Sequence, residues 1–269
     1  MKKTILTLVI LVFLLSGLMA FVEQHQIRIN RIIIKDASIP QQFNNKKIAF
    51  ISDIHCGPYF SIKRVRNLVE MINKLHPDII LLGGDYVYRN KANIYLCAKE
   101  LKELKAPLGV IAVLGNHDYG QGPISIKNVL TEAGILIMDN TGKWINVDNS
   151  RIKIGGLADF WCSSPNITNI LQETSEKDFV MVLSHNPDFS ERITCNRVDL
   201  VLSGHTHGGQ ITCFGLWAPF TSSQYGQKYR SGVVQTPHTK VVITNGIGTT
   251  GMPLRFFAPP SIELLTLNH

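Results

Sequence analysis

The sequence predicts an α/β fold that is preceded by one membrane-spanning helix. Short apolar runs of the kind that form buried strands alternate with amphipathic helical segments, an order typical of a parallel sheet with helical crossovers. Polar residues follow directly after five of the apolar runs, where the strands are expected to end. The chain has 269 residues, enough for one large domain with a well-buried core.

The N-terminal segment has eighteen consecutive uncharged residues, from Ile5 to Val22. This run is mostly Leu, Ile, Val and Phe, and it is long enough to cross a bilayer as a helix. A signal-peptide cut needs small residues before it, but the best site, after Ala20, has Leu18 at the minus-three position. We assign residues 1–23 to a membrane anchor or signal segment and favour an uncleaved anchor over both a cleaved signal and a buried core helix.

The charges around this span bear on which side of the membrane the rest of the chain occupies. Lys2 and Lys3 precede the span and argue for a cytoplasmic N-terminus, so that the following domain would face outward. Five basic residues follow the span and compete with them: Arg28, Arg31, Lys35, Lys46 and Lys47. These residues and the formal net charge of +7 would also suit an anionic cytoplasmic leaflet. We predict a cell-membrane location and favour the extracytoplasmic side, with sidedness left open.

The cysteines do not indicate a disulfide framework. They are odd in number and form no CxxC pair. They are Cys56, Cys97, Cys162, Cys195 and Cys213. Cys56 lies close to one of the polar strand ends, and we interpret it as a small buried residue rather than a metal ligand.

The first strong strand is expected at residues 48–51, because this apolar run is typical of a strand buried on both faces. It is followed by Asp53 and His55, two residues apart. An amphipathic helix with apolar residues at three- and four-residue spacing is expected over residues 61–75 and ends before Pro77. Residues 24–46 are expected to form a linker and a first strand, and residues 47–269 the main domain.

The pattern of strand and helix continues along the chain. Further buried strands are expected at residues 78–82, 110–114, 179–183 and 199–202, with helices at 93–104 and 125–133. Weaker or closing strands are expected at residues 135–138, 152–154, 241–243 and 262–267, with a short helical stretch at 167–171. Residues 208–239 show no clear period and are interpreted as a functional loop.

The polar residues after the strands should converge, because right-handed crossovers place the carboxyl ends of parallel strands on one edge of a sheet. Seven candidate metal ligands follow the strands: Asp53, His55, Asp85, Asn116, His185, His205 and His207. Such a mixture of carboxylate, carboxamide and imidazole suits divalent transition metals, and no cysteine pairing supports structural zinc. Seven ligands exceed what one metal uses, whereas two metals about 3.5–4 Å apart can share a carboxylate and support phosphoester hydrolysis.

In sequence order, the motifs are Asp53-x-His55, Gly84-Asp85, Gly115-Asn116-His117-Asp118, His185 and Gly204-His205-Thr206-His207. This set resembles the calcineurin-like metallophosphoesterase family. The resemblance implies a β-sandwich of two mixed sheets flanked by helices. It also implies that Asp53, His55 and His207 hold one metal, that Asn116, His185 and His205 hold the other, and that Asp85 bridges them.

The same resemblance gives His117 a catalytic role without metal coordination. This residue would contact the phosphate and act as an acid or a transition-state stabiliser, with Asp118 as its orienting partner. Manganese is the first choice for both metals, while zinc or iron fits the same ligands.

Three stretches, residues 183–188, 203–210 and 245–256, resemble the membrane-associated bacterial branch of the family. That branch includes phosphodiesterases and proteins similar to UDP-2,3-diacylglucosamine pyrophosphatases. The expected activity is hydrolysis of a phosphodiester or pyrophosphate bond in a small molecule or nucleotide-lipid at the membrane. Arg255 would either pair with a phosphate or serve as a structural anchor, and the weaker candidates Tyr225 and Tyr229 receive no role.

Other functions remain as alternatives. The compact His-x-His-x-Asp-His motif of metallo-β-lactamases is absent. A phosphomonoesterase or a phosphoprotein phosphatase could use the same ligands. A non-catalytic binding scaffold of the same fold is disfavoured because all seven ligands and His117 are present. No charged groove signature marks a nucleic-acid substrate, so none is predicted.

Overall fold

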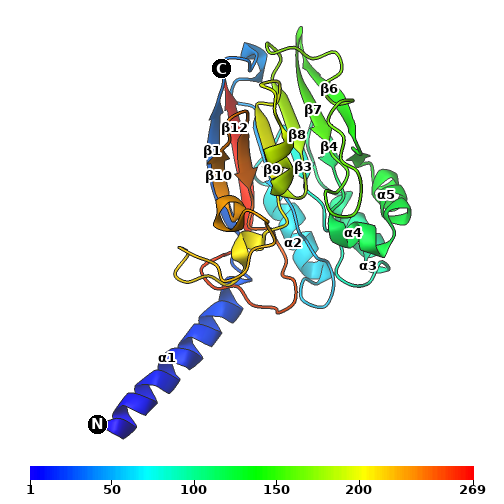
Figure 1. The fold of residues 1–269 in the computed structure, drawn as a ribbon. Helices are drawn as coiled ribbons and strands as arrows, with labels where there is room; N and C mark the ends of the chain where they lie inside the picture. Colours follow the sequence, from blue (N-terminus) through cyan, green and yellow to red (C-terminus); the bar gives the residue numbers. More distant parts are fainter.

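The computed structural model describes residues 1–269 and consists of two six-stranded sheets packed face to face (Figure 1). The first sheet has the strand order β1-β12-β2-β3-β4-β5. Its strands are β1 (Arg28–Lys35), β12 (Ser261–Asn268), β2 (Lys47–Ile51), β3 (Ile79–Leu82), β4 (Val110–Ala112) and β5 (Leu136–Ile137). Only the pair β12 and β2 is antiparallel, so the sheet is mixed.

The second sheet has the strand order β10-β11-β9-β8-β7-β6. Its strands are β10 (Gly232–Gln235), β11 (Lys240–Ile243), β9 (Leu200–Ser203), β8 (Val180–Leu183), β7 (Ser150–Gly156) and β6 (Thr141–Val147). The four central strands are parallel, and both edge strands pair antiparallel with their neighbours. This sheet is therefore mixed as well.

Helices cover the outer face of the first sheet, and shorter turns cover that of the second. These helices are α2 (Ile62–Asn73), α3 (Asn93–Leu101), α4 (Asn116–Gln121) and α5 (Pro123–Glu132), while a further helix, α1 (Lys2–Glu23), precedes the sheets and does not cover them. The 3₁₀ turns are η1 (Gln41–Phe43), η2 (Pro187–Arg192), η3 (His207–Gly209) and η4 (Gly226–Tyr229). Side chains of α2, α3 and α5 share one core with the first sheet, while η2 and η4 contribute to the core outside the second.

The strands read as continuous apolar runs because both of their faces are buried. In β2, Ile48 and Phe50 pack between the two sheets, whereas Ala49 and Ile51 pack beneath the helices. In a strand, alternate side chains point to opposite faces, so a run without polar residues is required when both faces lie in cores.

The predicted two-sheet sandwich of mixed sheets is confirmed, and the five strong strands lie where they were expected. Some details differ, including the short helix α4, which was not predicted. The expected short helix at 167–171 is a series of turns, and the predicted loop at 208–239 contains β10. The strand β6 was not predicted, because its burial alternates irregularly on a half-exposed edge.

The helix α1 projects away from the domain at the end where the chain loops gather (Figure 1). It is 22 residues long, and its length and composition are sufficient to cross a membrane. Only 6% of its most apolar window is buried against the domain. The single apolar N-terminal helix that the sequence predicts is therefore present as a separate element.

Candidate metal centre

The seven predicted ligands lie at the carboxyl ends of strands from both sheets. Asp53 and His55 follow β2, Asp85 follows β3, Asn116 begins α4 after β4, His185 follows β8, and His205 and His207 follow β9. The structure brings all seven together, although three strands belong to the first sheet and two to the second. Which of them bind metal stays a prediction, and the distances below describe how they are arranged.

Five of the seven have left-handed backbone conformations. The φ angles are 55° at Asp53, 48° at His55, 58° at Asp85, 70° at His205 and 53° at His207. Residues with a Cβ enter this region rarely, at a cost of roughly 1–2 kcal/mol each. Backbone strain of this kind concentrates at functional sites, where the surrounding structure holds it in place.

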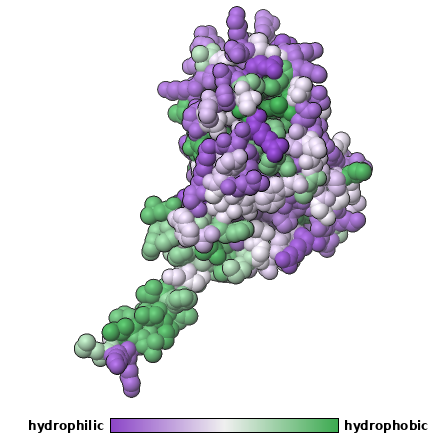
Figure 2. All heavy atoms as spheres, in the orientation of Figure 1, coloured by the Kyte–Doolittle hydropathy of each residue, from purple (hydrophilic) through white to green (hydrophobic).

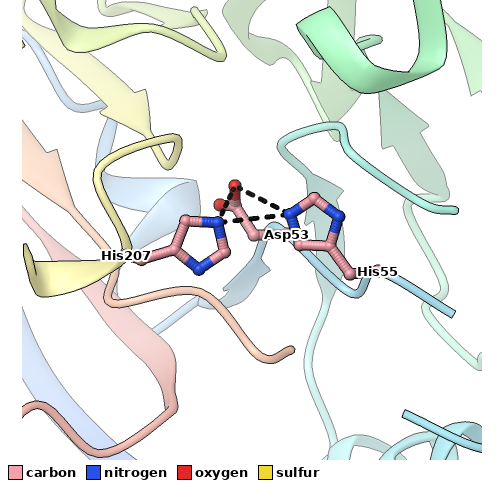
Figure 3. Close-up of side chains that lie close together, drawn as sticks. All are labelled: Asp53, His55 and His207. Carbon is pink, nitrogen blue, oxygen red and sulfur yellow. Dashed lines mark hydrogen bonds and ion pairs between the residues drawn. The ribbon is translucent and has the colours of Figure 1, made fainter. Parts of the chain in front are cut away.

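Asp53, His55 and His207 form one group, shown in Figure 3. The Nε2 atoms of His55 and His207 are 3.2 Å apart, and His207 Nε2 is 3.4 Å from Asp53 Oδ1. The three side chains point their nitrogen and oxygen atoms toward one another, as a shared cation would require.

His185, Asn116 and His205 form a second group. His185 donates a hydrogen bond from Nδ1 to the carbonyl oxygen of Gly83 at 2.8 Å, which leaves its Nε2 to face the site. That Nε2 is 3.2 Å from Asn116 Oδ1 and 3.2 Å from His205 Nδ1. A backbone carbonyl that orients the far ring nitrogen is a common support for a metal-binding histidine.

Asp85 lies between the two groups. Its Oδ2 is 3.6 Å from His55 Nε2 and 3.4 Å from His185 Nε2. Its Oδ1 accepts a hydrogen bond from the backbone N–H of His117 at 2.9 Å, at the start of α4. One carboxylate thus contacts both groups and also positions the helix that carries Asn116.

Three of the candidate histidines favour the neutral form, while His185 is held protonated by its carboxylate neighbour. Burial lowers the pKa of His55 to about 4 and that of His205 to about 3, so both rings are neutral at pH 7, the form that binds metal. Burial also lowers the pKa of His207. For His185, burial lowers the pKa, but the carboxylate of Asp85 outweighs it and raises the pKa to about 10. Positive charge beside Asp85 is therefore strongly favoured.

The donor set fits divalent metal ions. His55 Nδ1 and His205 Nε2 are buried without a hydrogen-bond partner, and several ring nitrogen and side-chain oxygen atoms face each other at 3.2–3.6 Å. Buried lone pairs that face one another need a positive charge between them. Carboxylate, carboxamide and imidazole are ligands that divalent transition metals accept.

The glycines of the motifs let the backbone approach these side chains. A Cβ at Gly115 would lie 2.2 Å from Asp85 Oδ1 and 2.6 Å from His185 Cε1. A Cβ at Gly204 would lie 2.2 Å from Asp53 Oδ2. No side chain fits at either position without displacing a carboxylate of the site.

His117 lies at the rim of the centre and is half-buried. Its ring meets that of His55 edge to face, with centroids 4.9 Å apart. A ring nitrogen of His117 comes within 4.8 Å of ligand atoms of His55 and Asp85. The structure thus places His117 beside the first group and Asp85, close enough to join a metal site there.

Asp118 does not orient the His117 ring, as the resemblance had suggested. Its carboxylate is fully buried and accepts hydrogen bonds from the backbone N–H groups of Asp85, Tyr86 and Gly115 at 2.7–3.0 Å. The residue instead holds the loop after β3 against the turn that precedes α4. It is a positioning residue for Asp85.

Arg255 is a structural anchor, which decides between its two predicted roles. The side chain is fully buried, and its guanidinium donates to backbone carbonyl oxygens. These acceptors belong to His207, Asn245, Gly246, Gly248 and Ala258. The guanidinium has no open direction for a phosphate, and it fixes the loop behind His207.

The two tyrosines left without a role lie away from the centre. Tyr229 is buried in the core outside the second sheet, and its hydroxyl donates to Glu191. Tyr225 is half-exposed and packs edge to face on Tyr229.

Two aromatic residues at the centre were missed from the sequence. Tyr88 packs its ring against both His55 and His117, at centroid distances of 5.9 and 6.4 Å. Trp161 stands edge to face on His205 at 4.2 Å and is half-exposed. Tyr88 follows the Gly84-Asp85 motif by three residues, which could have indicated it, whereas nothing in the sequence around Trp161 relates it to a motif.

A two-sheet α/β sandwich whose strand ends gather aspartate, asparagine and histidine defines a metal-dependent hydrolase. The family profile described as calcineurin-like phosphoesterase matches residues 46–209, and the chain belongs to this family. The predicted family is thereby confirmed, and the chain is a hydrolase acting on phosphoester bonds.

Known proteins similar to this chain carry the same family name. An uncharacterized metallophosphoesterase of Bacillus subtilis, YkuE, is 34% identical over 259 residues, covering 93% of this chain and 89% of that protein. An uncharacterized metallophosphoesterase of Aquifex aeolicus is 31% identical over 261 residues, covering 94% and 96%. Among solved structures, the NAD nucleotidase of Haemophilus influenzae shares the fold, with a TM-score of 0.51 and 15% identity over 75% of this chain and 45% of that one.

Substituting Gly115→Ala should disrupt the centre without unfolding the protein. The new methyl group would overlap Asp85 Oδ1, and moving that carboxylate by about 1 Å is expected to lower activity by roughly 10²-fold. Hydrolysis of a soluble phosphodiester, together with the thermal unfolding temperature, measures both effects. The matched control is Gly120→Ala in α4, where a Cβ meets no atom within 4 Å. Full activity of Gly115→Ala would contradict the packing described.

Substituting Arg255→Lys should reduce stability rather than substrate binding. Lysine cannot reach the same carbonyl groups, and buried acceptors left unpaired cost about 2–4 kcal/mol in total. Thermal unfolding in detergent checks this, with Arg31→Lys on the exposed face of β1 as the control. A raised KM with unchanged stability would instead indicate that the guanidinium contacts phosphate.

Proposed function

We propose that this protein is a dinuclear phosphoesterase that hydrolyses phosphodiester or pyrophosphate bonds with a metal-activated water. The observation that carries the proposal is the position of Asp85, whose Oδ2 lies within 3.6 Å of imidazoles from both ligand groups. A carboxylate shared in this way is the arrangement that a two-metal site uses.

The predicted ligand set would hold the metals as follows. Asp53, His55 and His207 would bind one ion, Asn116, His185 and His205 the other, and Asp85 both. When bound, such a pair of ions supplies a nucleophilic water at neutral pH and neutralises charge on the phosphoryl group. Manganese is the first choice, and zinc or iron suits the same ligands.

His117 would act on the substrate rather than on the metals. Its half-buried ring stands beside His55 and opens to the rim of the centre, where a departing oxygen could accept a proton. Tyr88 packs against the same ring and limits how it can turn. The proposed role is proton donation to the leaving group.

The apolar helix α1 supports a membrane location. Residues 1–23 would form the anchor, residues 24–46 the linker with β1, and residues 47–269 the metallophosphoesterase domain. A phosphoester in the headgroup region, such as a nucleotide-lipid like UDP-2,3-diacylglucosamine, would then be within reach. Purified full-length protein with manganese, assayed on a phosphomonoester, a phosphodiester and a UDP-sugar lipid, ranks these substrate classes.

Substituting Asp85→Asn should lower the metal content of both sites. A neutral amide leaves two incomplete coordination spheres with excess positive charge, so the protein should retain well under about two metals per chain. Elemental analysis of the purified variant measures this. Asp139→Asn, which alters a surface carboxylate paired with Lys127, is the control. Two tightly held metals in Asp85→Asn would refute the bridging role.

Substituting His117→Asn should affect substrates according to their leaving groups. A positioned general acid contributes roughly 10²–10⁴-fold in rate, and an alkoxide needs its proton far more than p-nitrophenolate does. Activity on alkyl phosphodiesters should therefore fall much further than activity on p-nitrophenyl diesters, with metal content unchanged. Equal losses would assign His117 to electrostatic stabilisation of the phosphoryl oxygens. Loss of a metal would make it a ligand.

A further inference from the structure

A loop at the site end of the domain exposes several large apolar side chains. This loop, residues 211–220, follows η3 and is called the apolar loop below. Phe214, Leu216, Trp217 and Phe220 are 71%, 82%, 53% and 75% exposed. An exposed cluster of large apolar residues usually marks an interaction surface.

The tip of the apolar loop is held in a defined shape. Cys213 and Trp217 form an isolated antiparallel bridge, with the N–H of Cys213 donating to the carbonyl of Trp217 at 2.7 Å. Gly215 has a φ of 74°, and Arg230 donates to its carbonyl at 2.8 Å. The polar backbone is thus satisfied internally while the apolar side chains point outward, which favours an apolar partner.

The apolar loop is tied to the end of α1 through residues 255–257. The N–H of Thr212 donates to the carbonyl of Phe256 at 2.9 Å, and the rings of Phe214 and Phe257 are 5.5 Å apart. The N–H of Phe257 in turn donates to the buried carboxylate of Glu23 at 2.7 Å. One short segment therefore holds the loop beside the end of the helix.

The figures also place the apolar loop at the same end of the domain as α1. In Figure 1, α1 leaves the domain beside the yellow and orange loops. In Figure 2, hydrophobic surface covers α1 and continues onto the adjoining end of the domain, whereas the opposite end is mostly hydrophilic. The side chains of the apolar loop therefore lie at the level where the helix would enter a bilayer.

We propose that the apolar loop docks on the bilayer that α1 enters, with Trp217 at the level of the headgroups. Trp is enriched at that level, and Phe and Leu bury their side chains just beneath it. This inference rests on the proposed anchoring by α1. The docked loop would hold the domain in one orientation, instead of leaving it tethered by a single helix.

Docking would also orient the cleft beside the candidate metal centre toward the membrane surface. A cleft of about 410 Å³ is lined by Phe220 of the apolar loop, by Met252 and by the candidate ligand His207. With the loop on the bilayer, this cleft faces the headgroup region. The substrate class that fits is a phosphoester of a membrane lipid, whose apolar part enters along Phe220 and Met252.

Quenching of Trp217 by brominated lipid tests the docking directly. The chain has three tryptophans, so Trp144→Phe and Trp161→Phe leave Trp217 as the only one, and excitation at the red edge of tryptophan absorption avoids the tyrosines. Full-length protein is reconstituted into phosphatidylcholine and phosphatidylglycerol vesicles, with or without bromine high on the acyl chains. Trp217 is expected to lose roughly half of its emission or more in brominated vesicles, as a side chain at the interface should.

The matched control places the fluorophore on the far end of the domain. Ile33 in β1 is 61% exposed and pairs with Thr266 near the C-terminus, at the end of the domain opposite α1. A chain with Ile33→Trp, in which Trp144, Trp161 and Trp217 are all replaced by Phe, should therefore show no quenching. Equal emission of Trp217 with and without bromine, in protein that floats with the vesicles, would overturn the docking but not the anchor. A blue-shifted, bromine-insensitive Trp217 would mean that a second copy or another protein covers the loop.

The outcome separates docking from catalysis and from anchoring. The variant Asp85→Asn should show the same quenching, because the measurement does not depend on the metals. Protein that fails to float with the vesicles would overturn both the anchor and the docking. Inactivity of the unsubstituted protein on every phosphoester, with quenching intact in the Trp217 variant, would overturn only the proposed function.

Discussion

The structure depends on one electrostatic constraint, the convergence of buried carboxylate, amide and imidazole atoms that need positive charge between them. Asp85 stands at its centre, with imidazole nitrogens from both ligand groups within 3.6 Å. Without a cation, the buried lone pairs that face each other would repel. The carboxylate of Asp85 also raises the pKa of His185 against the effect of burial, so positive charge is favoured beside it.

Bringing these atoms together requires unfavourable backbone conformations, which hydrogen bonds from neighbouring residues stabilise. Five candidate ligands have left-handed φ angles, and each follows a strand that cannot shift because both of its faces are buried. Asp118 ties the loop of Asp85 to the turn before α4, and Arg255 ties the loop behind His207 to five carbonyl groups. Asp118 therefore supports the centre through the backbone, whereas Arg255 contacts both the backbone and the Nδ1 atom of His207.

The same loops connect the metal centre to the N-terminal helix. Arg255 donates from its side chain to the carbonyl of His207 and from its backbone to that of Ala20 at the end of α1. The residue whose guanidinium holds the backbone of His207 therefore also contacts the end of the helix. The end of α1 and the candidate ligand His207 are thus joined through a single side chain and its own backbone.

The sequence by itself determined the strong strands, the order of the motifs and the metal-binding character of the site. Strands buried on both faces must be continuous apolar runs, and few residue types can coordinate metals, so both features are visible in the chain. Only the tertiary structure decided the rest. Arg255 bonds to carbonyls instead of phosphate, and Trp161 stands over His205, because contacts between distant segments set these roles. The pairing of β1 with β12 likewise joins residues from opposite ends of the chain, which no local pattern encodes.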